Sequence, residues 1–374
     1  MSRAGPGGGA PPVVSAWSAV SCFGIGRSAF TAAMAGGARP PAVAAAPCAP
    51  RPDDAVYPVP SFDPRAVLGR KGTRTMDRVS GFAVAAAREL LGGTPDASLD
   101  AGGGDRTAVV LATAGNPQAM RDFTRASLTA AKPFHVDPAV IPSGVPNCAA
   151  GLVAIWNGLT GPNTTINTGR AAALNAVGHA RRLLVAGRAD RVIVGAFEAH
   201  SATRARLDPH RAQPGEPGAP GTGIGEGGAV FLLENAAACG EGPREPLLDV
   251  LHVAHRTGAP DDFAAAVRGC VEEALDRSGL HPGQVWAARG SECAGEPGRQ
   301  ERRVLAELFA PEVCDRVRPP GNGDTGSAVA AFQIAAALAV PAPPDAPVAI
   351  AVTAVDPGGT AACAVLRRRP QGRA

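Results

Sequence analysis

Apolar and polar positions along the chain follow two recurring patterns. Short runs of Val, Ile, Leu and Ala have the length of buried strands, and longer stretches repeat apolar residues at helical spacing. The predicted strands are residues 107–112, 191–196, 229–234, 247–253, 347–353 and 361–366. The predicted helices are residues 79–91, 171–185, 262–278, 300–309 and 326–340. Their alternation predicts an α/β protein, and the near-continuous apolar strands predict a sheet that is covered on both faces.

A weak internal repeat suggests two similar halves. Gly227-Gly228 and Gly358-Gly359 each lead into an apolar strand, and upstream of each lies a turn that opens a helix of small residues. These turns are residues 168–171 and 322–326. We therefore expect one half at residues 13–245 and another at 246–368, with flexible ends at 1–12 and 369–374. The Pro- and Gly-rich residues 213–228 are expected to form a surface loop.

Composition and charge exclude some classes of function. The chain has 374 residues and a formal charge of +3 from 36 basic and 33 acidic residues, which does not favour a nucleic acid or an anionic membrane as partner. The basic residues 367–369 are expected to be a solvated end. The 8 cysteines are scattered, as in a reduced cytosolic protein. Without an apolar span or a signal-peptide profile, the sequence predicts a soluble cytoplasmic protein.

Several segments together resemble the beta-ketoacyl synthase family of the thiolase fold. They occur in the family's order and extend from about Val13 to Leu366. The segments are residues 62–64, 68–72, 76–78, 141–151, 161–168, 174–176, 225–227 and 233–234. The resemblance implies a thiolase-like fold whose two similar halves build five layers in the order α-β-α-β-α.

The positions that carry catalysis in this family hold other residues here. An active ketosynthase takes the acyl chain on a cysteine and uses two histidines in decarboxylation. The resemblance places Arg170 at the cysteine, Arg289 and Asp324 at the histidines, and Pro357 at the gating phenylalanine. A guanidinium cannot act as a nucleophile. We therefore expect no catalytic residue in this set and no independent condensation activity.

Two further positions of the family pattern are only partly kept. The family's active-site lysine falls at about Pro319, and Glu301 fits the family's glutamate if one residue is inserted. The three charged replacements, Arg170, Arg289 and Asp324, are expected to converge where the catalytic groups stood. Because unpaired buried charges are unstable, we predict that Asp324 pairs with Arg170 or Arg289 and fills the former pocket.

A catalytically empty member of this family resembles the chain-length factor of bacterial type II polyketide synthases. The resemblance implies a heterodimer with an active ketosynthase, in which this chain shapes the tunnel for an acyl chain borne by an acyl carrier protein. By position, the tunnel-shaping residues are Asn116, Pro117, Met120, Phe123 and Thr124. Met120 and Phe123 could face the tunnel or be ordinary core residues. Arginine in place of the usual glutamine suggests a divergent branch, such as one making polyene-like chains.

Two other functions fit the sequence. The chain could be a divergent acyltransferase or decarboxylase of the same fold, or a homodimeric acyl-binding scaffold. Candidate residues outside the family positions are His179, His200, the pair His252 and His255, and Cys148. Each is expected to be a packed or surface residue, and the histidine pair lacks a third metal ligand. We expect no metal and no cofactor.

Overall fold

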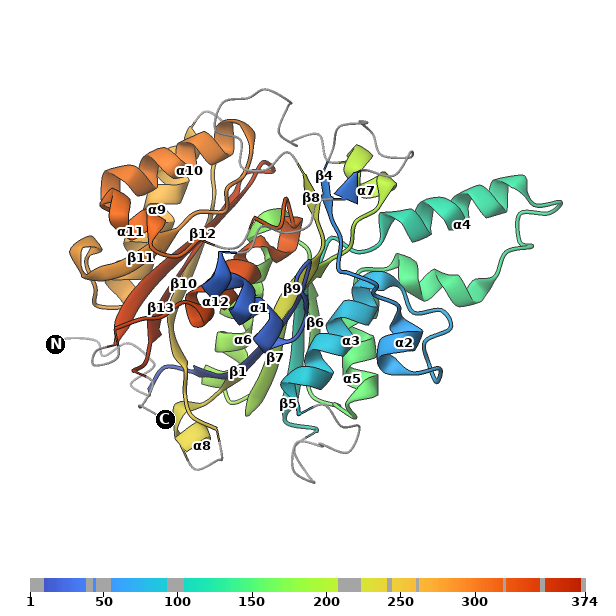
Figure 1. Ribbon diagram of the computed structural model, residues 1–374, viewed down its shortest axis with the longest axis horizontal. Coiled ribbons are helices and arrows are strands. Elements are labelled where there is room, and N and C mark those ends of the chain that lie inside the picture. The colour runs from blue at the N-terminus through green and yellow to red at the C-terminus, as the bar shows by residue number, and fades with distance from the viewer. Residues whose placement is uncertain are drawn as a thin grey trace.

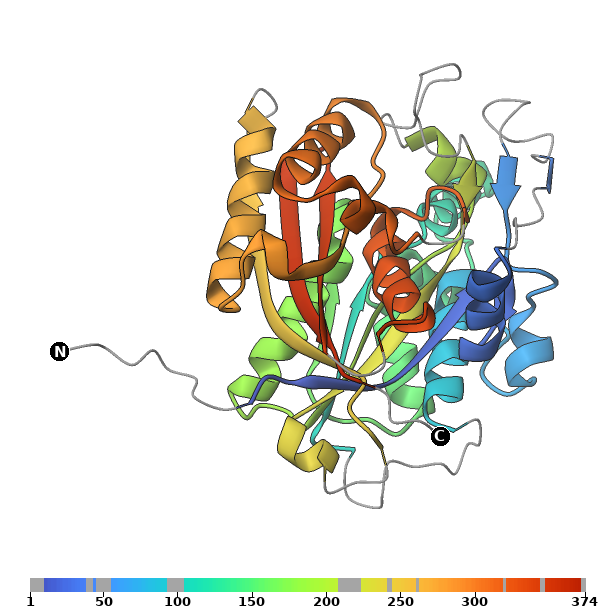
Figure 2. The same cartoon turned by 60° about the vertical axis from the view of Figure 1, so that its left-hand side comes forward.

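The computed structural model describes residues 10–37, 43–44, 55–92, 104–207, 223–240, 244–259, 262–318, 321–343 and 347–370 (Figure 1 and Figure 2). The main strands follow one hydrogen-bonded path in the order β11-β12-β13-β10-β1-β9-β7-β5-β6. Their bounds are β1 (Val13–Ser21), β5 (Thr107–Ala112), β6 (Asn163–Ile166), β7 (Arg191–Glu198), β9 (Gly227–Glu234), β10 (Leu248–Thr257), β11 (Val285–Arg289), β12 (Val348–Asp356) and β13 (Thr360–Arg368). Short strands are β2 (Gly24–Ile25), β3 (Val43–Ala44), β4 (Ala55–Tyr57) and β8 (Ile224–Gly225).

Helices cover the strands on both sides. They are α1 (Arg27–Gly36), α2 (Pro64–Leu68), α3 (Arg78–Leu90), α4 (Pro117–Thr129), α5 (Cys148–Trp156), α6 (Ala172–Val185), α7 (Ala202–Leu207), α8 (Ala236–Gly240), α9 (Phe263–Arg277), α10 (Gly295–Leu308), α11 (Pro311–Asp315) and α12 (Val329–Ala339). Short 3-10 turns include η1 (Pro138–Gly144), η2 (Gly169–Ala171), η4 (Pro282–Gln284) and η5 (Gly326–Ala328).

The strands form two groups that meet at β1 and β10. The register between these two strands includes only two residue pairs, Val13 with Asp249 and Val14 with Leu248. By contrast, β1 pairs with β9 along most of its length. The narrow contact lets the two groups turn away from each other and enclose helices between them (Figure 2).

Successive side chains of a strand point to opposite faces of the sheet and therefore pack in different layers. In β5, Val110 packs in a central core between the two strand groups, whereas Leu111 packs under α3 and α5. In β12, Val352 faces the same central core, whereas Ala351 faces α9. Figure 1 shows α3 and α5 on one outer side, α9 and α10 on the other, and α1, α6 and α12 in the middle. The predicted five-layer thiolase-like architecture is confirmed.

Most predicted elements are present with small shifts at their ends. Each predicted strand overlaps an observed one, and each predicted helix overlaps α3, α6, α9, α10 or α12. The division near residue 245 falls between β9 and β10. Two separate halves with this boundary remain a prediction. Pro319 lies outside the described residues.

Described residues near both ends of the chain contact the sheet, and the flexibility of residues 1–12 and 369–374 remains a prediction. Within the described part, the main-chain oxygen of Pro12 accepts a hydrogen bond from Val250. Arg367 and Arg369 both pair with the buried carboxylate of Asp249, at 2.9 and 2.7 Å. Arg368 is 7% exposed and donates to carbonyl oxygens at the end of α12. The basic residues therefore fasten the end of β13, and the prediction of a solvated tail was wrong.

The predicted surface loop at residues 213–228 is only partly described. Residues 208–222 lie outside the described part of the chain, whereas Ile224 to Gly228 are buried in β8 and β9. Gly225 lies so close to the main chain that a Cβ atom there would be 1.9 Å from the oxygen of Asn322. The end of this segment is therefore core structure, because glycine permits the close approach.

Helix α4 and turn η1 project from the body (Figure 1). Asn116 caps α4 by accepting a hydrogen bond from Ala119 N at 3.1 Å, and Pro117 occupies its first turn. None of the side chains of α4 is buried. Among the described residues, no single helix is long and apolar enough to cross a bilayer. Turn η1 and helix α5 together have sufficient length and apolar composition, but the two segments are bent by 103° relative to each other.

Candidate functional site

The two central helices begin at matching turns that contact each other. Turn η2 leads into α6, and turn η5 leads into α12. Each turn starts with a glycine in the left-handed region, Gly169 with φ of 60° and Gly326 with φ of 55°. The internal repeat in the sequence therefore corresponds to two equivalent helix entries, which place Arg170 and Asp324 opposite each other.

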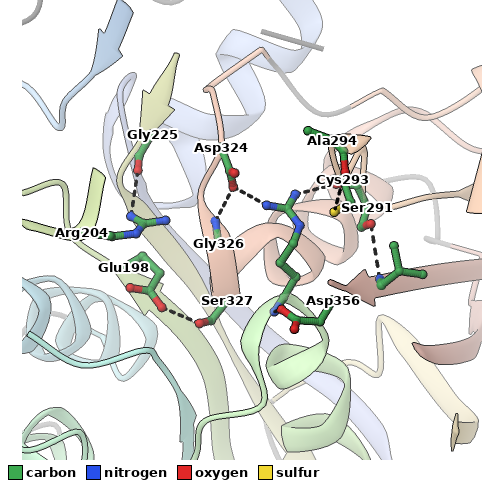
Figure 3. Close-up of polar contacts among 12 residues, drawn as sticks. Glu198, Arg204, Gly225, Ser291, Cys293, Ala294, Asp324, Gly326, Ser327 and Asp356 are labelled. Atoms are coloured by element: carbon green, nitrogen blue, oxygen red, sulfur yellow. Dashed lines mark hydrogen bonds and ion pairs between the residues drawn. The ribbon is translucent and has the colours of Figure 1, made fainter. Parts of the chain in front are cut away.

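Arg170 is bonded to Asp324, Ser291 and Asp356, which are labelled in Figure 3. Its Nη1 lies 2.5 Å from Oδ1 of Asp324, and its Nη2 donates to the main-chain oxygen of Ser291 at 3.0 Å. Its main-chain N–H donates to Oδ2 of Asp356 at 2.9 Å. The side chain is 11% exposed. The predicted ion pair with Asp324 is confirmed, and Arg170 is the arginine that forms it.

The charge of Asp324 is stabilised from several directions. Burial by itself raises the pKa of this carboxyl, but the nearby cations Arg170 and Arg204 outweigh burial and hold the pKa at about 2. The N–H of Gly326 also donates to Asp324 Oδ1, at 2.8 Å. At neutral pH the pair is therefore a carboxylate beside a guanidinium.

Asp356 sits where β12 ends and reaches under the start of α6. Its Oδ2 accepts from Arg170 N, and its Oδ1 accepts from the N–H of Gly358 at 2.8 Å. Gly169 leaves the space for this carboxylate, because a Cβ atom at that position would lie 1.9 Å from Asp356 Oδ2. The family pattern pointed to Pro357 in this turn, but the role of the neighbouring Asp356 was not predicted from the sequence.

Glu198 is a fully buried acid at the end of β7. One oxygen accepts from Ala114 N at 2.6 Å and from the hydroxyl of Ser327 at 2.5 Å. Burial raises the pKa of Glu198 despite the opposing effect of Arg204. Arg204 donates to the main-chain oxygens of Ala199 and Gly225, at 3.2 and 3.3 Å, and so stays beside the site.

These side chains surround a cavity of about 480 Å³. Arg170, Asp324, Asp356 and Pro357 contribute to its wall, and Cys293 adds a thiol. The prediction that the ion pair fills the former pocket was wrong, because the pair lies along the wall and leaves open space. Burial raises the pKa of Cys293 to about 12, so this thiol is protonated at neutral pH and is a poor nucleophile.

Arg289 does not join the other charges. It ends β11, its guanidinium pairs with Glu292 three residues later, and it is absent from the cavity wall. Burial lowers the pKa of Arg289, and Arg318 nearby lowers it further. The expected convergence of three charges was therefore wrong for Arg289, because a local partner holds its long side chain.

The strand end beside Arg289 is fixed by a buried glutamate. Glu301 accepts from the N–H of Ser291 at 3.0 Å and from its hydroxyl at 2.7 Å, and Thr353 donates to it at 2.7 Å. This network positions the Ser291 carbonyl that receives Arg170. Glu301, which fits the family pattern, thus acts on the site indirectly, by holding Ser291.

The other candidate residues lie off the cavity wall. His179 is half-buried on α6 and lies 3.4 Å from the Thr164 hydroxyl, and burial lowers its pKa. The main-chain N–H of His200 donates to Glu226 at 3.1 Å. His252 lies on β10, where burial lowers its pKa, next to His255 on the same strand. Burial also raises the pKa of the Cys148 thiol. In the described parts of the chain, no three potential ligands gather as a metal site.

The tunnel candidates extend from the cavity to the projecting helix. Pro117 contributes to the cavity wall, and Asn116 caps the helix beside it. Met120 is 44% exposed and lies against Gly144 of η1. Phe123 is half-buried and Thr124 is exposed. The structure thus places the candidates on one helix that begins at the cavity, and their tunnel role remains a prediction.

Four residues of the site were not predicted from the sequence: Arg204, Cys293, Ser327 and Asp356. Ser327 follows the glycine of the second helix turn, and Cys293 follows the strand that ends at Arg289, so both lie near predicted positions. Arg204 reaches the cavity from α7, which was not predicted. No local sequence pattern marks its contact with β8.

Comparison with known proteins agrees with this geometry. Residues 38–238, more than half of the chain, match the family described as "Beta-ketoacyl synthase, N-terminal domain". A 3-oxoacyl-[acyl-carrier-protein] synthase 2 from Coxiella burnetii is 27% identical over 250 residues, and one from Synechocystis is 31% identical over 249. Each match covers 61% of this chain and 59% of the relative's length.

Solved structures extend the similarity to nearly the whole chain. A structure titled "The ishigamide ketosynthase/chain length factor" is 41% identical, covers 96% of this chain and 99% of its own, and has a TM-score of 0.86. A beta-ketoacyl synthase from Burkholderia phymatum shares the fold at 17% identity, with a TM-score of 0.76, over 96% of this chain and 100% of its own. The chain belongs to the beta-ketoacyl synthase family.

Proposed function

We propose that this chain is a non-catalytic, chain-length-factor-like subunit that pairs with an active ketosynthase during polyketide elongation. The observation that carries the proposal is Arg170 at the nucleophile position, with its guanidinium bound to Asp324 and its amide bound to Asp356. A residue held in this way cannot accept an acyl group. The 41% identity to a structure titled as a ketosynthase/chain length factor supports the assignment.

Several exposed apolar side chains on neighbouring elements support a protein partner. We define the arm face as the exposed apolar side chains on and between α4, η1 and α5. Its members and their exposed fractions are Met120 (44%), Leu128 (80%), Phe134 (72%), Val140 (37%), Ile141 (45%), Val145 (42%) and Ile155 (76%). Because α4 and α5 both contact η1, these exposed apolar side chains lie on neighbouring elements, which favours their burial against another protein.

Strand β6 offers a second feature for pairing. It ends the described sheet and is hydrogen-bonded only to β5. Unpaired edges of this kind invite another strand. We take the sheet edge and the arm face together as the candidate interface, because β6 contacts α5, which carries Ile155. We propose the active ketosynthase as its occupant.

The position of α4 suggests how the subunit could set product length. The helix starts at the cavity with Asn116 and Pro117, and Met120 lies one turn further along. If the arm face meets the partner, the side chains of Met120, Phe123 and Thr124 would lie near the partner's acyl tunnel. We therefore propose these five residues as the tunnel-shaping set, acting on a chain borne by an acyl carrier protein.

One observation favours the alternative of a divergent acyltransferase or decarboxylase, namely the retained cavity of about 480 Å³. The groups around it oppose this alternative. The Cys293 thiol is protonated at neutral pH because burial raises its pKa to about 12. The guanidinium of Arg170 is already bonded to Asp324, and its main-chain N–H is already bonded to Asp356. The non-catalytic subunit is therefore the better-supported proposal.

Co-expression tests the proposal. The full chain is produced with a candidate partner ketosynthase that has the Cys-His-His residues, and the complex is analysed by native mass spectrometry and by polyketide synthesis with an acyl carrier protein. We expect a 1:1 complex in which only the ketosynthase carries the acyl group. A homodimer of this chain that acquires an acyl group from labelled acyl carrier protein would contradict the proposal.

A further inference from the structure

Asp356 places an anion at the start of α6. Its Oδ2 lies 2.9 Å from the main-chain nitrogen of Arg170, and its other oxygen is bonded to the N–H of Gly358. The first N–H groups of a helix have no partner within the helix and attract anions. Here a side chain from β12, 186 residues away in sequence, already occupies one of them.

The occupied N–H belongs to residue 170, the position of the acyl-carrying residue in the family. In acyl transfer, main-chain N–H groups near the nucleophile stabilise the negative oxygen of the tetrahedral intermediate. An N–H that already donates to a carboxylate is not free to do this. A fixed negative charge next to the same position would also oppose a thiolate and an oxyanion.

The backbone is built to accept this carboxylate. Gly169 has φ of 60°, and a Cβ atom on it would lie 1.9 Å from Asp356 Oδ2 and 2.4 Å from Cγ. Any other residue at this position would push the carboxylate away from the amide. Gly169 and Asp356 therefore form a matched pair that is separate from the Arg170–Asp324 ion pair.

We propose that Asp356 is a resident anion that blocks acyl transfer at position 170, whatever side chain that position carries. The inference rests on the proposed function, since it explains a second cause of catalytic loss. It implies that restoring a cysteine alone would not restore a reactive site. At position 170, the arginine removes the nucleophilic side chain, and Asp356 occupies the main-chain N–H.

The test installs a thiol and varies the carboxylate in the full-length chain. The variants are R170C, R170C/D356A, R170C/D356N and the matched control R170C/D324A, which removes another carboxylate of the cavity. Each is treated with an octanoyl thioester of N-acetylcysteamine. The thiolate introduced by R170C attacks the carbonyl carbon, the C–S bond to the leaving group breaks, and N-acetylcysteamine leaves as a thiolate that takes a proton from water. Mass spectrometry of the peptide that carries position 170 measures the acyl group.

We expect R170C/D356A to be acylated at least about tenfold faster than R170C, equivalent to one pKa unit or more of relieved repulsion. D356N removes the charge and keeps an oxygen for the amide, so R170C/D356N should fall between them. The control R170C/D324A should stay closer to R170C than R170C/D356A does, because Asp324 does not bind the amide. Equal rates for R170C and R170C/D356A would overturn the proposal.

A second measurement separates reactivity from folding. The rate of iodoacetamide alkylation at the introduced thiol is followed against pH, and each variant's thermal midpoint is recorded. We expect the alkylation profile of R170C/D356A to shift to lower pH than that of R170C, since the adjacent charge is gone. An unchanged profile in folded variants would overturn the electrostatic part of the proposal. Both readouts concern this chain alone, so they are independent of whether a ketosynthase binds it.

Discussion

Gly169 and Asp356 fit together because Gly169 has no side chain: a Cβ atom on it would lie 1.9 Å from Asp356 Oδ2. The carboxylate then reaches the N–H of Arg170 at 2.9 Å. Two positions 187 residues apart therefore constrain each other at the entry of α6, the position that the family resemblance aligns with the nucleophile.

This contact predicts a non-additive pair of substitutions. We expect G169A to lower the free energy of unfolding by about 2–4 kcal/mol, because it adds a steric clash to the strain of a left-handed φ. In a D356A background the clash is relieved, and the same change should cost only about 1 kcal/mol. Urea denaturation of the four proteins measures the coupling. Equal costs in both backgrounds would show that the two residues do not constrain each other.

The Arg170–Asp324 ion pair predicts a specific dependence of stability on pH. The folded-state pKa of Asp324 is about 2, below its ordinary value of 3.8. The carboxylate therefore contributes stability that is fully present above about pH 4 and is lost as the pH falls through 2. This contribution is about 2 kcal/mol, from a shift of nearly two units.

Removing the charge should abolish that dependence. D324N should be about 2–3 kcal/mol less stable than the natural chain at pH 7, because Arg170 loses its partner. The difference should shrink between pH 4 and pH 2. Denaturation midpoints at pH 7, 4, 3 and 2 test this, with D315N as control, since the exposed Asp315 pairs with the exposed Arg318. A difference that is constant with pH would contradict the assignment.

The arm face predicts which changes disrupt the complex. A charge at its most exposed positions, L128D or I155D, should weaken co-purification with the ketosynthase by at least about tenfold, since the interface would bury an unpaired carboxylate. I25D is the matched control, because Ile25 is 37% exposed and lies on β2 outside the arm face. Retention of the complex by L128D and I155D would place the partner elsewhere.

The tunnel set predicts an effect on product length. M120A and F123A should each allow the ketosynthase complex to extend its product by one or more two-carbon units, because each change removes side-chain volume beside the proposed tunnel. T129A at the far end of α4 serves as control, since the Thr129 hydroxyl donates to the Arg125 carbonyl within the same helix. Mass spectrometry of the products from the reconstituted system gives the length. Unchanged products from both variants would remove α4 from the tunnel.

Much of the fold could be predicted from local sequence patterns. Apolar alternation in β5 and β12 and small-residue helices such as α6 are properties of short segments, and these were predicted within a few residues. The burial of Ile224 was not predicted, because it depends on a bridge to Asp324 that no local pattern reveals. The contacts of the basic residues 367–369 were missed for a similar reason: Arg367 and Arg369 are fixed by Asp249, over a hundred residues away.

Several residues of the candidate site could be predicted from the sequence, but most of the contacts between them could not. The family pattern predicted the proximity of Arg170 and Asp324. Arg170 lies within turn η2, Asp324 lies two residues before turn η5, and these two turns are in contact. Arg289 has a flexible side chain at a strand end, and its neighbour Glu292 decides where the guanidinium goes. Asp356 was overlooked because its partner is a main-chain N–H, which every residue but proline carries.

The contacts around the start of α6 also provide a diagnostic signature. Gly169, Arg170, Asp324 and Asp356 depend on one another through direct contact, so a change at one alters what the others can be. In other members of the family these four positions should vary together as one inherited unit. A relative that has lost its acyl-carrying site in the same way would then be recognised by this four-residue combination. The combination is more specific than the absence of a cysteine.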